Sequence, residues 1–140
     1  MKKAIALVIL MCFICMFSTA CDKKTEEKVS LWDDAAYTEN VTLGNGDKTI
    51  ELEVKAEDKS VTFSIKTDAE NLEDALCEHK LIEGEEGPYG LYIKKVNGIT
   101  ADYDIDQSFW SLSQDGTPSL TCASGAEING GEHFEFIYTK

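Results

Sequence analysis

Two runs of alternating apolar and polar residues, separated by a short polar break, restrict the fold of this chain more than any other feature. Successive side chains of a strand point to opposite faces, so each run predicts a strand with one buried face. The break at residues 57–59 is short enough to join the two strands as a β-hairpin. The two apolar rows are Ile50, Leu52 and Val54, and Val61, Phe63 and Ile65.

A helical pattern follows the hairpin directly. Thr67 and Glu70 have the spacing of a capping box, which predicts that a helix begins at Thr67. Apolar residues then recur at helical spacing until Gly84, which gives a helix of about three turns. Its apolar stripe is expected to pack on the buried face of the hairpin. The stripe consists of Leu72, Ala75, Leu76 and His79.

The rest of the chain predicts strands separated by turns. Asn97-Gly98 is a strong hairpin signal, and Asp115-Gly116 is a second turn. The order β-β-α-β-β-β-β predicts an α+β fold, in which one helix packs across a mixed sheet. The expected strands after the helix are residues 89–96, 99–103, 109–112 and 134–138, and residues 120–126 are ambiguous.

The N-terminus has the pattern of a secretory signal. Lys2 and Lys3 precede an uncharged, largely apolar stretch, residues 4–17, which is too short to span a hydrocarbon core of about 30 Å. Small residues then lead to Cys21, which predicts a lipoprotein signal at residues 1–20 and lipidation of Cys21. The alternative is an ordinary signal peptide cut near Ala20. Lipidation implies a protein anchored in the cell membrane on its extracytoplasmic side.

A polar segment of mixed charge, residues 21–40, separates the signal from the domain. It lacks a clear period, so we expect a flexible tether followed by one domain at residues 41–140. Leu31, Trp32 and Tyr37 are apolar exceptions, which either dock on the domain or remain exposed contacts.

Charge and cysteine content exclude some functions and leave others open. Without Lys2 and Lys3, the chain has 11 lysines, no arginine and 26 acidic residues, a net charge of −15. Such a chain is a poor nucleic-acid ligand, since that affinity comes largely from Lys and Arg at phosphates. Cys77 and Cys122 remain after the signal and the lipidated cysteine are set aside. Export permits a disulfide between them, but sequence spacing does not decide whether it forms.

The residue pattern predicts neither catalysis nor a cofactor. No Gly-x-Ser-x-Gly motif occurs, and His79 and His133 have no neighbouring nucleophile. Residues 102–106 place carboxylates at alternate positions, but Gln107 and Ser113 stand where a calcium loop needs Gly and Glu. An irregular calcium site or a solvated acidic loop remains, and no metal site is predicted.

An aromatic cluster provides the one candidate site. Phe109 and Trp110 are adjacent, so in a strand they point to opposite faces. If Phe109 is in the core, Trp110 lies on the other face or at the rim, as a platform for a flat ligand or as a plug of that face. The predicted ligand-binding residues are Asn97, Gly98, Tyr103, Trp110, Ser111 and Leu112.

Several short motifs occur in the order seen in a known family. They are residues 67–72, 89–92, 96–99, 109–112, 117–120 and 131–136. Over residues 42–139 the chain resembles bacterial domains similar to the C-terminal β-domain of transcobalamin and intrinsic factor. The resemblance implies a β-grasp-like fold and, from the animal carriers, binding of cobalamin. There the segment equivalent to Trp110-Ser111-Leu112 lines one side of the corrin ring, partly through backbone groups.

Two departures from that family bear on the ligand. The animal carriers supply most contacts, and any cobalt-coordinating histidine, from a large helical domain that has no counterpart here. Ser111 and Ser113 also stand where the bacterial domains are usually more aromatic.

The leading expectation is a non-catalytic surface lipoprotein that captures cobalamin, another corrinoid or a similar flat ligand for a membrane transporter. A second ligand-binding protein or a second copy would cover the ligand's other side. The alternative is a surface interaction or structural module without a small-molecule ligand.

Overall fold

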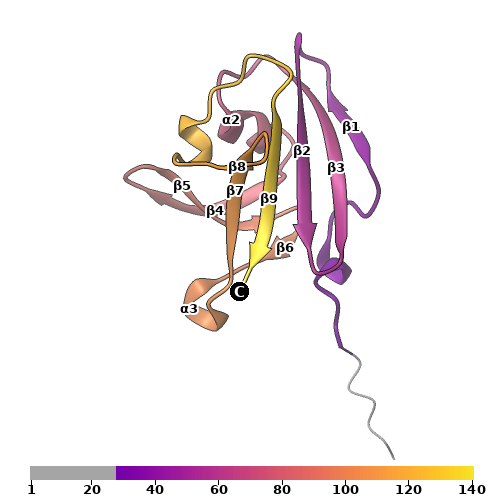
Figure 1. The fold of residues 1–140 in the computed structure, drawn as a ribbon, viewed down its shortest axis with the longest axis vertical. Helices are drawn as coiled ribbons and strands as arrows, with labels where there is room; N and C mark the ends of the chain where they lie inside the picture. The colour runs from indigo at the N-terminus through magenta and orange to yellow at the C-terminus, as the bar shows by residue number, and fades with distance from the viewer. Residues whose placement is uncertain (1–27) are drawn as a thin grey trace, which may run out of the picture.

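Two sheets, of six and three strands, make up most of the chain in the computed structural model, which describes residues 28–140 (Figure 1). The expected signal, residues 1–20, and Cys21 lie outside the described residues. The elements are η1 Leu31–Asp34, β1 Val41–Gly44, β2 Lys48–Ala56, β3 Lys59–Thr67, α2 Leu72–Cys77, β4 Ile82–Gly87, β5 Gly90–Val96, β6 Ile99–Thr100, α3 Tyr103–Asp106, β7 Phe109–Gln114, β8 Thr117–Pro118, η2 Ala123–Gly125 and β9 His133–Thr139.

The larger sheet is mixed, with strand order β1-β3-β2-β9-β7-β8, and the smaller sheet has the order β4-β5-β6. The predicted mixed sheet is therefore confirmed, but the structure is mostly β and its helices are all short. Both sheets contribute side chains to one core, so a large part of the helix-on-sheet packing expected from the sequence is replaced by sheet-on-sheet packing. Within residues 28–140, no helix has the length and apolar character needed to cross a membrane.

The predicted hairpin is confirmed in its register as well as in its strands. β2 and β3 pair antiparallel, and every apolar residue of one row stands opposite an apolar residue of the other. Cross-strand neighbours share a face, so the two rows form one apolar surface, of which no side chain is more than 2% exposed. The pairs are Ile50 with Ile65, Leu52 with Phe63, and Val54 with Val61.

The helix begins later than the capping-box spacing predicts. α2 covers six residues, and its N-cap is Asn71, whose side-chain oxygen accepts a hydrogen bond from the backbone N–H of Asp74 at 2.9 Å. Thr67 is the last residue of β3, and its hydroxyl accepts a bond from the N–H of Ala69 at 3.0 Å. The prediction was wrong because a Thr hydroxyl bonds the backbone two residues on in turns as well as at helix starts.

The apolar stripe is confirmed for three of its four predicted members, whereas His79 lies beyond the end of α2 at Cys77, and the helix is shorter than the three turns predicted. Leu72, Ala75 and Leu76 are fully buried in the same core as the hairpin rows.

Three other segments differ from the sequence-based expectation. Residues 82–87 form a strand, β4, which the glutamates and Gly84 concealed, and it pairs with β5 through an irregular register at Glu83/Gly84. The strand expected over residues 99–103 ends after two residues, and Tyr103 begins the short helix α3. The ambiguous residues 120–126 contain the 3-10 turn η2.

The segment at residues 30–40, which we call the N-terminal strap, is packed on the domain. Trp32 is only 5% exposed, and its Nε1–H donates a hydrogen bond to the carbonyl oxygen of Ala56 at 2.8 Å. The Tyr37 ring meets Phe63 edge-to-face, with centroids 5.5 Å apart. Of the two possibilities for these aromatic residues, docking is therefore the one observed, and this part of the expected tether belongs to the packed unit.

Candidate functional site

A cavity of about 500 Å3 lies between the β4–β5 hairpin, strand β7 and the segment around η2. We call it the aromatic pocket. Every residue that lines it is uncharged, although 28% of the chain is charged. Its lining consists of Gly87, Pro88, Tyr89, Gly90, Leu91, Tyr92, Ile93, Tyr103, Phe109, Trp110, Leu112, Ser119, Thr121, Cys122, Ala123 and Phe136.

Trp110 forms an inner wall of this pocket rather than its rim. The side chain is 8% exposed, whereas neighbouring Phe109 is 39% exposed. Both residues line the pocket, but their burial is the reverse of the first possibility considered from the sequence, since Trp110 is the buried residue of the two. Trp110 stands opposite Tyr138 in the antiparallel pair β7–β9, and their rings meet edge-to-face with centroids 5.6 Å apart. Tyr138 belongs to the same alternating row as buried Phe134 and Phe136, and that row determines which face Trp110 occupies.

The indole N–H of Trp110 has no hydrogen-bond partner within residues 28–140, although the atom is buried. Buried donors are nearly always paired, and leaving one unpaired carries a free-energy cost. Trp110, a residue of the pocket wall, therefore carries a buried polar group that is unpaired among residues 28–140.

The structure brings three of the six predicted ligand-binding residues to the aromatic pocket. Trp110 and Leu112 come from β7, and Tyr103 comes from α3 with 54% of its surface exposed. Ser111 does not line the pocket. Its hydroxyl donates to the carbonyl of Ile137 at 3.2 Å, since alternation in β7 turns it away from Trp110.

Asn97 and Gly98 lie at a different place, under the N-terminal strap. Asn97 is fully buried, and its side chain accepts from the N–H of Tyr37 at 2.9 Å and donates to the Tyr37 carbonyl at 2.8 Å. Gly98 has φ +81°, and a Cβ there would stand 2.4 Å from the carbonyl oxygen of Asp34. The turn was predicted correctly, but the strap covers it.

The β4–β5 hairpin supplies pocket residues that the sequence-based site omitted. Tyr89 and Tyr92 are 83% and 51% exposed and lie along the pocket wall. The hairpin is held in place by two bonds from elsewhere in the fold: the hydroxyl of Ser124 donates to the carbonyl of Tyr89 at 3.0 Å, and Glu73 accepts from the N–H of Leu91 at 3.2 Å. These aromatics were detectable in the sequence, but their approach to Trp110 depends on strand β4, which was not predicted.

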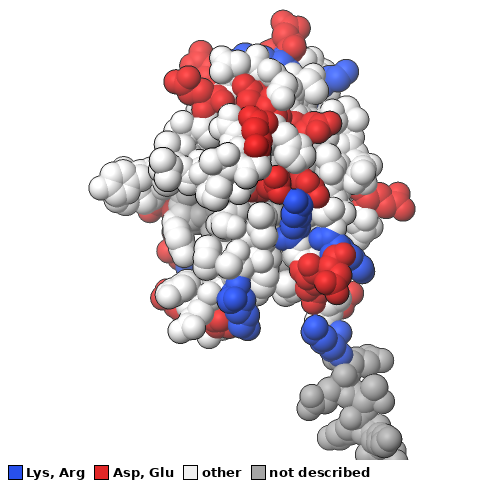
Figure 2. Space-filling view, in the orientation of Figure 1, with Lys and Arg blue, Asp and Glu red and all other residues white. Residues whose placement is uncertain are grey.

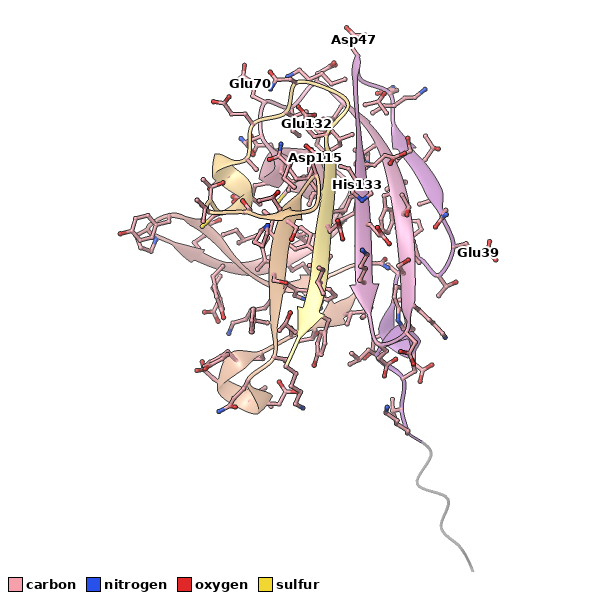
Figure 3. The ribbon with its side chains drawn as sticks, viewed as in Figure 1. Glu39, Asp47, Glu70, Asp115, Glu132 and His133 are labelled. Atoms are coloured by element: carbon pink, nitrogen blue, oxygen red, sulfur yellow. The ribbon has the colours of Figure 1, made fainter. Side chains whose placement is uncertain are left out.

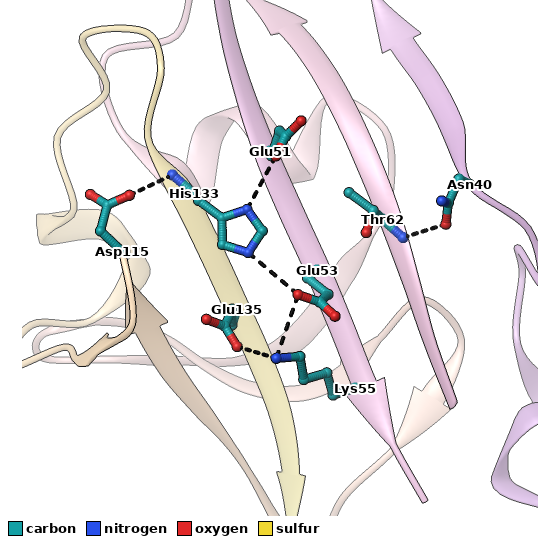
Figure 4. Close-up of polar contacts among 8 residues, drawn as sticks. All are labelled: Asn40, Glu51, Glu53, Lys55, Thr62, Asp115, His133 and Glu135. Atoms are coloured by element: carbon teal, nitrogen blue, oxygen red, sulfur yellow. Dashed lines mark hydrogen bonds and ion pairs between the residues drawn. The ribbon is translucent and has the colours of Figure 1, made fainter. Parts of the chain in front are cut away.

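A polar cluster occupies the outer face of the larger sheet (Figure 4). His133 Nδ1 is 3.2 Å from a Glu51 oxygen, and its Nε2 is 3.4 Å from a Glu53 oxygen. Lys55 lies between Glu53 and Glu135, and its hydrogen bond to Glu135 raises the pKa of the ammonium. Red and blue side chains are therefore interleaved on this face in Figure 2. Across the described residues, no three His, Cys, Asp or Glu side chains are arranged to hold a metal ion.

The acidic segment at residues 102–106 uses its carboxylates within its own fold. Asp102 accepts from the N–H of Asp104 at 3.0 Å and caps α3. Asp106 accepts from the Ser108 hydroxyl and pairs with Lys140, and these contacts lower the pKa of Asp106 to about 2. The sequence left open an irregular calcium site or a solvated acidic loop. The geometry supports the acidic loop, in which the carboxylates of Asp102 and Asp106 accept hydrogen bonds from nearby backbone N–H groups.

Cys77 and Cys122, the two cysteines among the described residues, are exposed and unbonded. Cys122 lines the aromatic pocket, and Cys77 lies at the end of α2. Partial burial, followed by the nearby charge of Glu73, raises the pKa of Cys77, so the thiol form is favoured there.

The comparisons with known proteins find relatives among solved structures only. No protein-family model and no curated protein matches the chain. A crystal structure of haptocorrin in complex with Cbi is similar in fold, with a TM-score of 0.54 and 20% identity. That match covers 70% of this chain and 26% of haptocorrin, so the chain spans about a quarter of that protein's length.

A second match is much closer in sequence. It is a protein from Ruminococcus gnavus ATCC 29149, described as a candidate metal-binding protein, with a TM-score of 0.63 and 33% identity. The match covers 67% of this chain and 98% of the R. gnavus protein. Because the identity extends over nearly the whole of that protein, the chain belongs to the same protein family as this R. gnavus protein.

Proposed function

We propose that this protein is a non-catalytic, lipid-anchored binding protein that captures a flat, largely apolar ligand, a corrinoid or a molecule of similar shape. The observation that carries the proposal is the aromatic pocket, an uncharged cavity of about 500 Å3 in a strongly acidic chain. Small-molecule sites are commonly of about 300–1,000 Å3 and mostly apolar with few polar groups. Tyr89, Tyr92 and Tyr103, which line the pocket and are more than half exposed, each carry a hydroxyl that supplies such a polar group.

The likeness of fold to part of haptocorrin, solved with Cbi, supports a corrinoid as the first ligand to test. We infer that the aromatic pocket, a cavity of about 500 Å3 open to solvent, contacts only one side of a corrinoid. We therefore propose that the other side is covered by a partner, either a membrane transporter or a second ligand-binding protein. The description of the R. gnavus protein suggests a metal instead, but the described residues of this chain present no ligand set for a metal ion.

The binding test uses the two tryptophans as reporter and control. Cyanocobalamin and cobinamide are titrated into the purified full chain, and the indole N–H signals of Trp110 and Trp32 are followed by NMR. We expect Trp110 to shift with ligand while Trp32 shifts much less, since Trp32 does not line the pocket and its indole N–H is hydrogen-bonded to the carbonyl of Ala56. A weak half-site predicts a Kd in the micromolar to millimolar range, about −8 to −4 kcal/mol. Unchanged spectra at about 1 mM corrinoid would reject corrinoid capture.

A second function is favoured by one observation, the exposed apolar side chains around the pocket. Tyr89, Ile105 and Leu120 are 83%, 82% and 102% exposed. Exposed apolar residues grouped in one region are typical of protein-contact surfaces. If no small ligand moves the Trp110 signal, a surface interaction module becomes the better proposal.

Lipidation is tested separately, through Cys21. Replacing Cys21 with Ser removes the thiol that would carry the lipid, so we expect the protein to move from the membrane fraction to the medium or periplasm. Fractionation followed by immunoblotting measures this, with Cys122→Ser as a matched control that should stay with the membrane. A Cys21→Ser variant that remains wholly membrane-bound would show that the anchor lies elsewhere.

A further inference from the structure

We infer that the aromatic pocket selects its ligand by charge, taking flat cationic groups before neutral ones and rejecting anionic ones. This inference rests on the proposed function, because it concerns the ligand of the same pocket. It follows from how the charged residues next to the pocket are arranged, since its lining carries no charge of its own.

The lysines that flank the pocket are already paired with carboxylates. On β5, Lys94 Nζ is 2.9 Å from a Glu85 oxygen and 3.5 Å from an Asp102 oxygen. Its neighbour Lys95 is 3.3 Å from Glu83. An anionic ligand would therefore find no free ammonium on this strand and would compete with existing ion pairs.

A fourth contact completes this arrangement beside α3. Lys140 is 3.0 Å from Asp106, three residues along the helix from the pocket residue Tyr103. The hydrogen bond to Asp106 raises the pKa of Lys140, so this ammonium is also paired with a carboxylate.

Carboxylates without an ion pair stand next to the lining. Glu86 is opposite Leu91 in the hairpin, Asp104 follows Tyr103, and both are exposed. Neither takes part in an ion pair among the described residues. The segments that flank the pocket, residues 83–95 and 102–106, thus carry six carboxylates against Lys94, Lys95 and the paired Lys140. This negative balance attracts cations and repels anions within a Debye length of about 8 Å at physiological salt.

The net charge of residues 28–140 as a whole also favours a cationic ligand. Four of the 13 lysines and three of the 26 acidic residues precede residue 28, which leaves nine lysines, 23 acidic residues and a net charge of −14. The exposed faces of Tyr89, Tyr92 and Tyr103 are also suited to a cation, because a positive charge is attracted to the negative face of an aromatic ring.

The test compares three ligands that share one ring and differ in charge. 1-Naphthylmethylammonium, 1-naphthalenemethanol and 1-naphthaleneacetate are titrated into the purified full chain at about 20 mM and at 1 M NaCl. The shift of the Trp110 indole signal is the readout. We expect the cation to bind about tenfold more tightly than the anion at low salt, and within about twofold at 1 M, where the Debye length falls to about 3 Å.

Two charge-matched double variants locate the effect. Glu86→Gln with Asp104→Asn removes two charges beside the pocket, and Glu39→Gln with Asp47→Asn removes two exposed charges on the far side of the sheet from β5 (Figure 3). The first should lower the cation-to-anion ratio more than the second. Equal ratios for all three ligands in the unchanged chain would overturn charge selection while ligand capture stands, and equal effects of the two variants would overturn the role of the flanking segments. If none of the three ligands shifts Trp110, charge selection is overturned, whereas ligand capture is decided by the corrinoid titration.

Discussion

Replacing Trp110 with Ala is expected to destabilise the domain by about 3–5 kcal/mol, the usual range for truncating a buried aromatic residue. The side chain is 8% exposed and packs edge-to-face on Tyr138 between the larger sheet and the pocket. Most small domains have a free energy of unfolding of only about 5–15 kcal/mol, so this substitution would remove a large part of it. Urea unfolding followed by circular dichroism measures the free energy of unfolding.

The adjacent residue provides the control. Phe109 is 39% exposed and lines the same pocket, so Phe109→Ala should cost far less stability while weakening ligand binding. A Trp110 platform at the rim, one of the two possibilities left open by the sequence, would instead contribute little to stability. A Trp110→Ala variant as stable as the unchanged chain would restore that view and contradict the packing described here.

Replacing Trp32 with Ala should destabilise the domain to a similar extent, by about 3–5 kcal/mol. Trp32 is 5% exposed and covers the end of the β2–β3 hairpin. Its loss would also leave the carbonyl of Ala56 without the indole donor now 2.8 Å away, which adds the cost of an unpaired polar group if water does not reach it. The same urea transition measures this effect, and protection of the Tyr37 amide against hydrogen exchange reports whether the strap has detached.

Val29→Ala, at the residue just before the strap, is the control for Trp32→Ala. Val29 lies three residues before Trp32 but is 76% exposed, so its truncation should leave the free energy of unfolding nearly unchanged. If Trp32→Ala and Val29→Ala had equally small effects, the strap would not belong to the cooperative unit, and the domain would begin after residue 40 as its composition suggested.

The strands near the start of the domain could be predicted because their pattern is local and repeated. In β2 and β3 every second residue is apolar, and a one-residue error in register would move a whole row out of the core. The turns Asn97-Gly98 and Asp115-Gly116 were predictable for a similar reason. Their first residues have φ of 51° and 50°, and the glycines that follow have φ of 81°, a backbone conformation that Asn, Asp and Gly adopt most readily.

The candidate site was only partly predictable, because adjacency in sequence does not decide which face of a strand is buried. Phe109 and Trp110 compete for the core, and both choices satisfy alternation. The pairing of β7 with β9 decides the matter, since it puts Trp110 on the side of Phe134, Phe136 and Tyr138. The paired residues, from Gln114 with Phe134 to Phe109 with Thr139, are far apart in the sequence, so the pairing leaves no local signal.

The sequence by itself thus determined the hairpin, its buried face, the apolar stripe of the helix and the main turns, because each depends on the conformational preferences and polarity of neighbouring residues. Only the tertiary structure decided where Trp110, the strap and the β4–β5 hairpin lie. Their positions depend on long-range contacts: Trp32 with Ala56, Asn97 with Tyr37, and Ser124 with Tyr89. Such contacts form only after the sheets have assembled, so the composition of each segment gives no indication of its partner.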